Sequence, residues 1–169
     1  MNAPNNITLA SNLQTPCFTF QSEVSHTGRN QTIAKKYAGK GTWAIVVFEG
    51  FDADDNIEPS TYYNLVNGLM SNVKEAPDIW VINYGCGGAS IKECLVPAAK
   101  DLLIQINQHY TKGVPKLPIS VLGISMGGIV GRIALAQLEA ENKLPNVVSF
   151  LFMDSPQSGA TGNVNVNLT

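Results

Sequence analysis

The sequence predicts an α/β fold, in which a mostly parallel sheet carries helices on both faces. Four short apolar segments are typical of buried strands, and segments with helical periodicity alternate with them. Strands that alternate with helices of this length form parallel sheets through right-handed crossovers. With 169 residues, of which 44% are hydrophobic and 14% charged, the chain has the size and composition of one soluble globular domain.

The first 40 residues predict an N-terminal lead-in with one possible edge strand. Residues 1–14 are rich in Asn and lack periodicity, which predicts little regular structure. Apolar and polar residues alternate between Pro16 and Val24, as in an edge strand. Residues 28–40 are basic and turn-prone and predict a connection without chemistry. We therefore expect the main α/β unit over residues 41–169.

The segment Trp43–Phe48 predicts the central strand, because its β-branched and aromatic residues suit a strand buried on both faces. Glu49–Asp52 follows it, and Pro59 then begins a helical pattern. Open α/β sheets bind ligands at the carboxyl ends of their strands. Gly50 allows close approach of a substrate there, and the Phe51 N–H is a candidate donor to an oxyanion.

Three further elements continue the alternation. Asp78–Tyr84 predicts a strand, Ile91–Tyr110 a long helix and Asn146–Met153 a fourth parallel strand. The glycine-rich turn Gly85–Gly88 lies between strand and helix, where a phosphate would bind. It lacks the spacing of a dinucleotide fingerprint and the lysine of a P-loop, so a nucleotide-binding module is the weakest of three functional hypotheses.

The most informative stretch is Val121–Gly128, an apolar strand that leads through Gly-x-Ser-x-Gly into a helical pattern. A serine on a tight strand-to-helix turn has strained backbone geometry, so the positions two residues away on either side must lack side chains. Gly123 and Gly127 meet that condition. Ser125 is then a candidate nucleophile, and the Met126 N–H is a candidate oxyanion donor at the start of the helix. The alternative is a glycine-rich turn without chemistry.

Composition excludes several classes of function. The net charge is −2 and no basic stripe is present, so we expect no nucleic acid partner. The apolar segments are too short for a transmembrane helix, and the N-terminus does not resemble a signal peptide, so the chain should be soluble. The three cysteines have no metal-ligand spacing. We expect reduced thiols, no metal site and no cofactor.

Three motifs, VVFEGFD, VLGISMGGIVGRIAL and LFMDSPQSGA, together resemble the α/β-hydrolase superfamily, in particular its lipase-like and inositol-deacylase-like serine esterases. The resemblance covers residues 42–162. It implies that Ser125 is the nucleophile, that Phe51 and Met126 form the oxyanion hole, and that the substrate is a small-molecule or lipid ester. Gln157 stands where these esterases usually have histidine, which removes a pocket-lining imidazole but no member of the triad.

In this superfamily the catalytic acid and histidine follow the serine along the chain. The two histidines here, His26 and His109, both precede Ser125, and His109 is expected at the surface near the amino ends of the strands. The general base is therefore expected to be missing, and residues 41–169 to form a partial hydrolase domain, incomplete at the C-terminal side. Asp154 has two open interpretations, as the triad acid or as a cap of the following turn.

The leading hypothesis is thus a serine hydrolase of carboxylic esters, represented by a fragment of its catalytic domain. The alternative is a non-catalytic or truncated binding domain of the same fold. Ser125 should lie in strained backbone before a helix in both cases. Hydrolysis should be very weak, and the strand Val147–Met153 should expose an edge through which the chain self-associates.

Overall fold

The computed structural model describes residues 22–26, 32–37, 42–52, 57–84, 91–111 and 117–156. Six strands and three α-helices, one of them preceded by a π-helical turn, lie in these ranges. In chain order they are β1 (Ser22–His26), β2 (Thr32–Tyr37), β3 (Ala44–Phe48), α1 (Pro59–Leu69), β4 (Asp78–Asn83), the π-helical turn η1 (Ile91–Leu95), α2 (Val96–Thr111), β5 (Ile119–Ile124), α3 (Met126–Ala140) and β6 (Val147–Met153).

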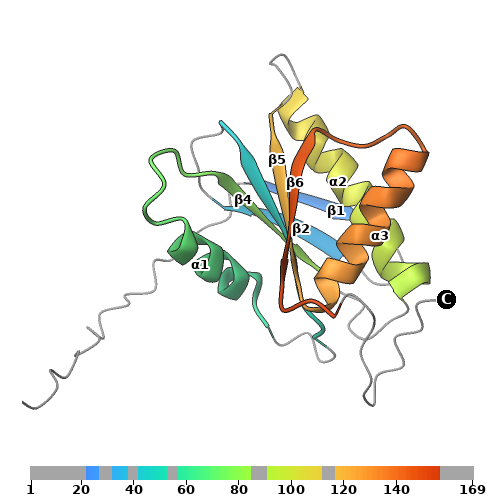
Figure 1. Ribbon diagram of the computed structural model, residues 1–169, viewed down its shortest axis with the longest axis horizontal. Helices are drawn as coiled ribbons and strands as arrows, with labels where there is room; N and C mark the ends of the chain where they lie inside the picture. The colour runs from blue at the N-terminus through green and yellow to red at the C-terminus, as the bar shows by residue number, and fades with distance from the viewer. Residues whose placement is uncertain are drawn as a thin grey trace, which may run out of the picture.

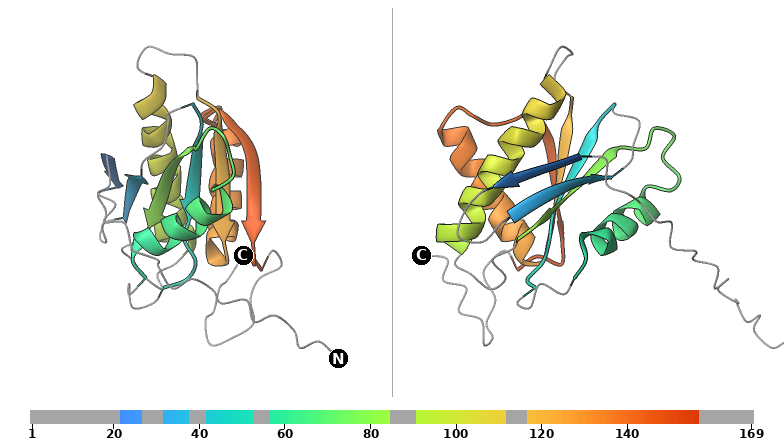
Figure 2. Two further views of the ribbon diagram at one scale, coloured as in Figure 1. Left: turned by 90° about the vertical axis from the view of Figure 1, so that its left-hand side faces the viewer. Right: turned by 180° about the vertical axis from the view of Figure 1, so that it is seen from behind.

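The strands form one mixed sheet in the order β1-β2-β4-β3-β5-β6. β4, β3, β5 and β6 are parallel to one another, whereas β2 is antiparallel to both β1 and β4. Helix α1 covers one face, and α2 and α3 cover the other (Figures 1 and 2). The predicted fold class, a mostly parallel sheet with helices on both faces, is confirmed.

Strand β2 is a difference from the sequence prediction, which placed a connection over residues 28–40. Ala34 and Tyr37 are buried, and the Tyr37 ring stacks on that of Tyr63 in α1 at a centroid distance of 4.6 Å. Lys36 forms an ion pair with buried Asp78 at the start of β4. The sequence around Lys36 resembles a loop because Asp78, the partner of Lys36, lies far along the chain. β1 overlaps the strand predicted over residues 16–24 only at residues 22–24, and residues 16–21 lie outside the described ranges.

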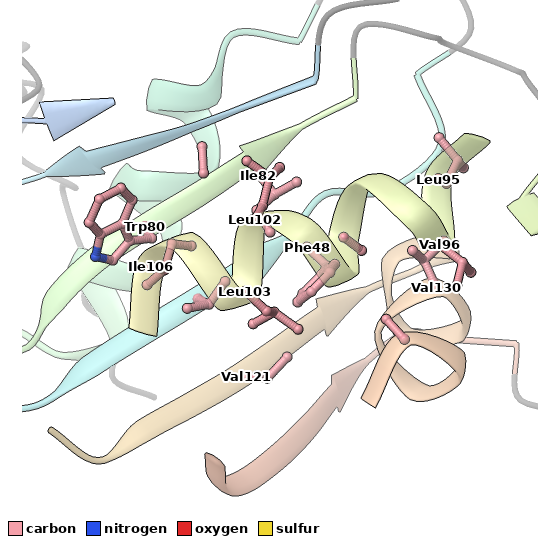
Figure 3. Close-up of a cluster of buried hydrophobic side chains, with 14 of the residues drawn as sticks. Phe48, Trp80, Ile82, Leu95, Val96, Leu102, Leu103, Ile106, Val121 and Val130 are labelled. Carbon is pink, nitrogen blue, oxygen red and sulfur yellow. The ribbon is translucent and has the colours of Figure 1, made fainter. Parts of the chain in front are cut away.

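The core has two layers, one on each face of the sheet. β3 and β4 are buried along their whole length, and their alternate side chains enter opposite layers. Phe48, Trp80 and Ile82 pack with Leu102 and Leu103 of α2 in the larger layer (Figure 3). The smaller layer lies under α1. Its buried members are Tyr37, Ile45, Val47, Tyr62, Tyr63, Val66, Ile79, Val81 and Leu122.

A polar network closes the sheet at the amino end of β4. Asp78, which is 1% exposed, accepts a hydrogen bond from the Tyr110 hydroxyl at 2.8 Å and pairs with Lys36 Nζ at 2.8 Å. The Tyr110 hydroxyl in turn accepts one from Trp80 Nε1 at 2.7 Å. A buried carboxylate is costly unless it is paired and hydrogen-bonded. These contacts compensate Asp78 and connect β2, β4 and α2.

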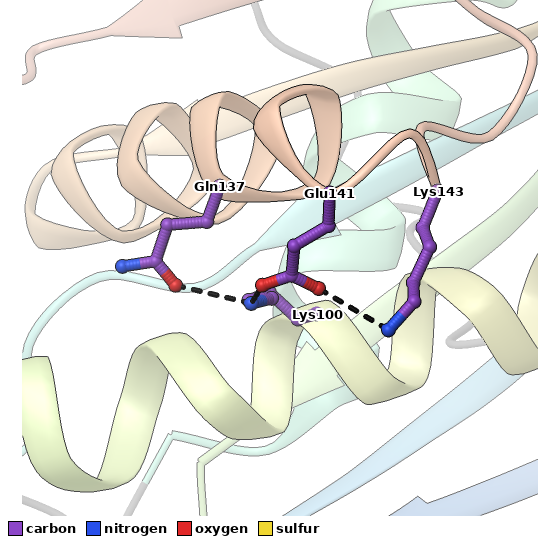
Figure 4. A network of polar contacts seen from close by, with 4 residues as sticks. All are labelled: Lys100, Gln137, Glu141 and Lys143. Carbon is purple, nitrogen blue, oxygen red and sulfur yellow. Dashed lines mark hydrogen bonds and ion pairs between the residues drawn. The ribbon is translucent and has the colours of Figure 1, made fainter.

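Helices α2 and α3 are also joined at the surface. Lys100 Nζ contacts Glu141 and donates to Gln137 Oε1 at 3.2 Å, while Lys143 approaches the second Glu141 oxygen at 3.5 Å (Figure 4). The hydrogen bond from Lys100 lowers the pKa of the Glu141 carboxyl. Exposed pairs of this kind contribute little to stability, so the apolar contacts between the helices dominate.

Cys94 in η1 forms a disulfide bond, which makes the expectation of three reduced thiols wrong. The other two cysteines, Cys17 and Cys86, lie outside the described residues. An odd number of cysteines without a recognisable spacing carries no information on which pair comes together in the fold.

Candidate functional site

Ser125 lies between the last residue of β5 and the first residue of α3. Its backbone angles are φ 49° and ψ −120°, a conformation that L-residues rarely adopt. Such strain persists only where the surrounding structure holds it, and it gathers at functional sites. The side chain is half-buried at the carboxyl end of the parallel strands. The expected geometry at Ser125 is confirmed.

Glycines make this turn possible because backbone occupies the space of their missing side chains. A Cβ on Gly123 would lie 2.3 Å from Gly128 Cα, and one on Gly127 would lie 2.3 Å from the carbonyl oxygen of Phe48. Real Cβ atoms do not come so close to backbone atoms, and backbone has no alternative rotamer to adopt. Gly123 and Gly127 are therefore required by the packing of α3 against β5 and β3, as the spacing predicted.

Two contacts, one from the last residue of β6 and one from the segment directly after it, hold the turn in place. The Ser125 N–H donates to the Met153 carbonyl at 2.9 Å, and the Ser155 hydroxyl donates to the Ser125 carbonyl at 2.7 Å. A Cβ on Gly128 would lie 2.1 Å from Ser155 Oγ. The structural roles of Ser155 and Gly128 were not predicted from the sequence. The second glycine of the Gly127–Gly128 pair was the available signal, because one glycine suffices for the Gly-x-Ser-x-Gly spacing.

The loop after β3 lies beside Ser125. A Cβ on Gly50 would lie 3.4 Å from Ser125 Cβ, so the two backbones are in close proximity. Phe51 follows and is 37% exposed, whereas Met126 is buried as the first residue of α3. The first N–H groups of a helix have no intrahelical acceptor and carry partial positive charge. The structure therefore places the start of the loop that carries Phe51 next to Ser125, with Met126 directly after Ser125 at the start of α3.

Glu49 is a buried acid at this loop that the sequence analysis did not single out. It is 2% exposed, and its carboxylate accepts hydrogen bonds from Asn83 Nδ2 at 3.1 Å and from the Tyr84 N–H. Burial and the charge of Glu49 raise the pKa of the Tyr84 hydroxyl. Burial and the same charge raise the pKa of Tyr62, which is also hydrogen-bonded to the Gly50 backbone. The loop thus begins in a charged but buried environment.

Asp154 lies directly after β6, with φ 47° and an exposed side chain. Its neighbour Met153 accepts the hydrogen bond from Ser125 N–H, so Asp154 is close to the Ser125 turn along the backbone. Asp52 is hydrogen-bonded locally, because its carboxylate accepts from the Ile57 N–H at 2.6 Å. Gln157 and Gly85–Gly88 lie outside the described residues.

Neither histidine of the sequence lies next to Ser125. His109 is exposed in the last turn of α2, near the amino end of β4, where its ring meets the edge of Trp80 at a centroid distance of 5.3 Å. His26 ends β1, which is four strands away from β5 in the sheet. At a strand spacing of about 4.8 Å, His26 is about 19 Å from the strand that carries Ser125. Both are therefore too far to take a proton from Ser125.

An apolar groove lies between α1 and the β5–β6 side of the sheet and reaches Met153, whose carbonyl accepts the hydrogen bond from the Ser125 N–H. Its volume is about 390 Å³. The lining side chains come from the region of α1 and from strands β3, β5 and β6, including the carboxyl end of β6. They are Trp43, Ile45, Val66, Leu69, Met70, Ser120, Val121, Leu122, Leu151, Phe152 and Met153.

The part of the chain that the structure describes contains no group of three or more His, Cys, Asp or Glu residues arranged to hold a metal ion. None of its helices combines the length and apolar character that a membrane span requires.

The order of the sheet, the turn at Ser125 and the loop after β3 together match a known architecture. The structure superposes on a bacterial heroin esterase with a TM-score of 0.59 at 16% identity, covering 84% of this chain and 46% of that one. The chain has the α/β-hydrolase fold. No family model matches the sequence of the chain, and no curated protein matches it either.

Two other solved esterases show the same α/β-hydrolase fold. A fungal esterase from Rhizomucor miehei gives a TM-score of 0.57 at 14% identity, covering 85% of this chain and 46% of that one. A hyperthermophilic esterase from Pyrobaculum calidifontis gives 0.55 at 17% identity, covering 79% and 44%. This chain therefore spans less than half the length of each of the three solved structures. Identities this low establish the fold alone.

Proposed function

We propose that Ser125 is the nucleophile of a serine esterase site that acts on carboxylic esters of small molecules or lipids. The observation that carries the proposal is the strained backbone of Ser125 at a strand-to-helix turn, held by glycines and by β6. The esterase neighbours support the same reaction class at the level of fold. Strain maintained by so many surrounding contacts is typical of a site under functional constraint.

The proposed reaction is acyl transfer. Ser125 Oγ attacks the ester carbonyl carbon while its proton passes to a base, and the tetrahedral oxyanion receives hydrogen bonds from the Phe51 and Met126 N–H groups. Collapse expels the alcohol and leaves an acyl-serine, which water then hydrolyses to release the acid. Asp154 is the candidate acid that would orient the base, and a turn-capping role is its alternative.

The base is a group other than the two histidines, because His109 lies near the opposite end of the sheet and His26 at its far edge. Without a proton acceptor a serine hydroxyl is a poor nucleophile. Oxyanion donors and binding alone retain a rate about a thousandfold above that of water. We therefore expect very slow ester hydrolysis by this chain. The same observation favours a second candidate function, a non-catalytic domain that binds esters or related ligands.

A fluorophosphonate probe, with and without added imidazole, tests the proposal. We expect slow labelling of Ser125 by the probe alone and faster labelling with imidazole, because the free base replaces the missing one. Peptide mapping by mass spectrometry locates the adduct. Ser125→Ala should abolish it, whereas Ser71→Ala at an exposed turn should not.

Two outcomes would change the conclusion. Rapid stoichiometric labelling of Ser125 without imidazole would show that a base is already present. Absence of labelling at any imidazole concentration would contradict a nucleophilic Ser125 and support the binding-domain alternative.

A further inference from the structure

Glu49 is an ionisable side chain placed inside the molecule at the start of the loop beside Ser125. It is 2% exposed and directly precedes Gly50 and Phe51. Burial of a carboxylate is unfavourable unless hydrogen bonds replace its hydration. An apolar residue would avoid that cost, so the contacts of this side chain indicate what it contributes to the loop.

Two contacts of the carboxylate reach the end of the neighbouring strand. The last backbone pair between β3 and β4 is Phe48 with Ile82. Beyond that pair, the Glu49 carboxylate accepts hydrogen bonds from Asn83 Nδ2 at 3.1 Å and from the Tyr84 N–H. The Tyr84 hydroxyl, by contrast, is buried and has no hydrogen-bond partner within the described ranges, whereas the Tyr84 backbone is anchored by Glu49. The side chain thus continues the connection of the two strands past the ladder.

The residue after Glu49 is fixed from two further directions. The Gly50 backbone is hydrogen-bonded to the hydroxyl of Tyr62 in α1. A Cβ on Gly50 would already be 3.4 Å from Ser125 Cβ. β4, α1 and the Ser125 turn therefore converge on one short piece of backbone, and the next N–H along the chain is that of Phe51.

We propose that Glu49 is a positioning residue whose carboxylate holds the loop after β3 so that the Phe51 N–H faces the oxyanion formed at Ser125. The proposal rests on the proposed esterase function for the part that concerns the oxyanion. Hydrogen bonds to a charged acceptor are stronger than those between neutral groups. A misplacement of about 1 Å at a reacting centre lowers a rate by about a hundredfold, so a firm anchor at this loop has a direct effect on rate.

Amide hydrogen exchange, measured by NMR, tests the anchoring without any need for activity. In Glu49→Ala we expect the Gly50 amide to exchange about tenfold faster than in wild type, while amides in the middle of β5 keep their rates. Glu141→Gln, which alters an exposed carboxylate between α2 and α3, is the matched control and should leave Gly50 unchanged. If Glu49→Ala does not fold, Asn83→Ala removes one donor only and should give a smaller increase.

The rate of Ser125 labelling by the fluorophosphonate probe with imidazole tests the consequence. Glu49→Ala should lower it about tenfold to a hundredfold, and Glu49→Gln should restore most of it, because a glutamine oxygen still accepts from the Tyr84 N–H. A role in stability alone would lower the melting temperature and leave the labelling rate of the folded protein unchanged.

The outcomes separate the two proposals. Unchanged Gly50 exchange in both Glu49→Ala and Asn83→Ala would overturn the anchoring role, whatever the probe shows. Faster Gly50 exchange together with no labelling of wild-type Ser125 would support the anchoring role and contradict the esterase function. Faster exchange with an unchanged labelling rate would overturn the effect on Phe51.

Discussion

The Ser155 hydroxyl donates a hydrogen bond to the carbonyl oxygen of Ser125 across 2.7 Å. The Ser125 N–H in turn donates to Met153, two residues before Ser155, at 2.9 Å. The strained residue is therefore held at both of its backbone polar groups by one neighbouring segment. This is the arrangement in which an unfavourable φ persists, since release of the turn would also break the contacts of β6.

Ser155→Ala should lower the free energy of unfolding by about 1 kcal/mol, the usual net contribution of one partly buried hydrogen bond. Urea unfolding measures the change, with Ser71→Ala at an exposed turn as a control that should lie within about 0.5 kcal/mol of wild type. Equal stability of Ser155→Ala and wild type would mean that water replaces the hydroxyl at the Ser125 carbonyl.

Alanine at two helical glycines should have opposite effects. Gly127→Ala places a methyl 2.3 Å from the Phe48 carbonyl oxygen and 2.4 Å from that of Glu49, so we expect a loss of about 3 kcal/mol or more. Nothing lies within 4 Å of a Cβ on Gly68 in α1, so Gly68→Ala should gain about 0.5–1 kcal/mol from helix propensity. Chemical denaturation of both variants checks the pair, and a mild effect of Gly127→Ala would show that α3 can move away from β3.

Tyr84→Phe should stabilise the protein. The Tyr84 hydroxyl is buried and has no hydrogen-bond partner among the residues that the structure describes, so folding removes it from water without compensation from them. Its removal should raise the free energy of unfolding by about 1 kcal/mol while the ring still fills its place in the core. Thermal unfolding is the measurement. A lower melting temperature in Tyr84→Phe would indicate that the hydroxyl makes a favourable contact in solution.

Stability should fall in alkaline solution, partly through Tyr110. Burial, opposed by a hydrogen bond from Trp80 and reinforced by Asp78, raises the pKa of Tyr110 above its ordinary value of 10.0. The folded state then keeps a proton that the unfolded state loses above pH 10, so the stabilisation is full below pH 10 and decreases as the pH rises further. Each such tyrosine contributes a slope of at most about 1.4 kcal/mol per pH unit, and less where solvent screens a half-buried group.

Tyr110→Phe tests this dependence. The variant should be less stable at neutral pH, because Asp78 and Trp80 lose a partner, but its stability should decline less steeply between pH 10 and 11. Urea unfolding at several pH values measures both slopes. Equal slopes would mean that Tyr110 titrates alike in the folded and unfolded states.

We propose that the β6 side of the sheet mediates self-association. β6 pairs only with β5 among the described strands, and Leu151 and Phe152 beside the apolar groove are 54% and 45% exposed. Unpaired strand edges with apolar faces favour pairing with another chain. Light scattering after size-exclusion chromatography should show a mass that rises with concentration. Leu151→Lys should reduce it and Leu144→Lys, outside the groove, should not, whereas a monomer at all concentrations would contradict the proposal.

The strands could be predicted where burial requires a nearly continuous apolar segment in the sequence. Asp78–Tyr84 and Asn146–Met153 were placed within about a residue of β4 and β6, because strands covered by helices consist of nearly continuous apolar residues. β2 escaped because its Lys35–Lys36 pair is polar and the buried partner of Lys36 is Asp78, on another strand. Local patterns do not record such long-range pairing.

The candidate site likewise has a part that could be predicted from the sequence and a part that could not. The geometry of Ser125 was predictable because its steric requirement falls on glycines two residues away. The roles of Glu49 and Ser155 were not predictable, because their partners lie far away in the sequence. Tyr84 is 35 residues from Glu49, and Ser125 is 30 residues from Ser155. A single sequence shows which residues are able to form hydrogen bonds. Only the fold shows which of them meet.

Strand β4 has a polar anchor at each end, and this has a consequence for how the sheet aligns. A slip of two residues would keep every apolar side chain of β4 on its own face, so the hydrophobic pattern alone tolerates the misalignment. It would also move Asp78 and Asn83 by about 7 Å. Asp78 would then leave Lys36 and Tyr110, and Asn83 would leave Glu49. The correct register of this inner strand is therefore selected by charge at its two ends, while burial between them supplies the cohesion.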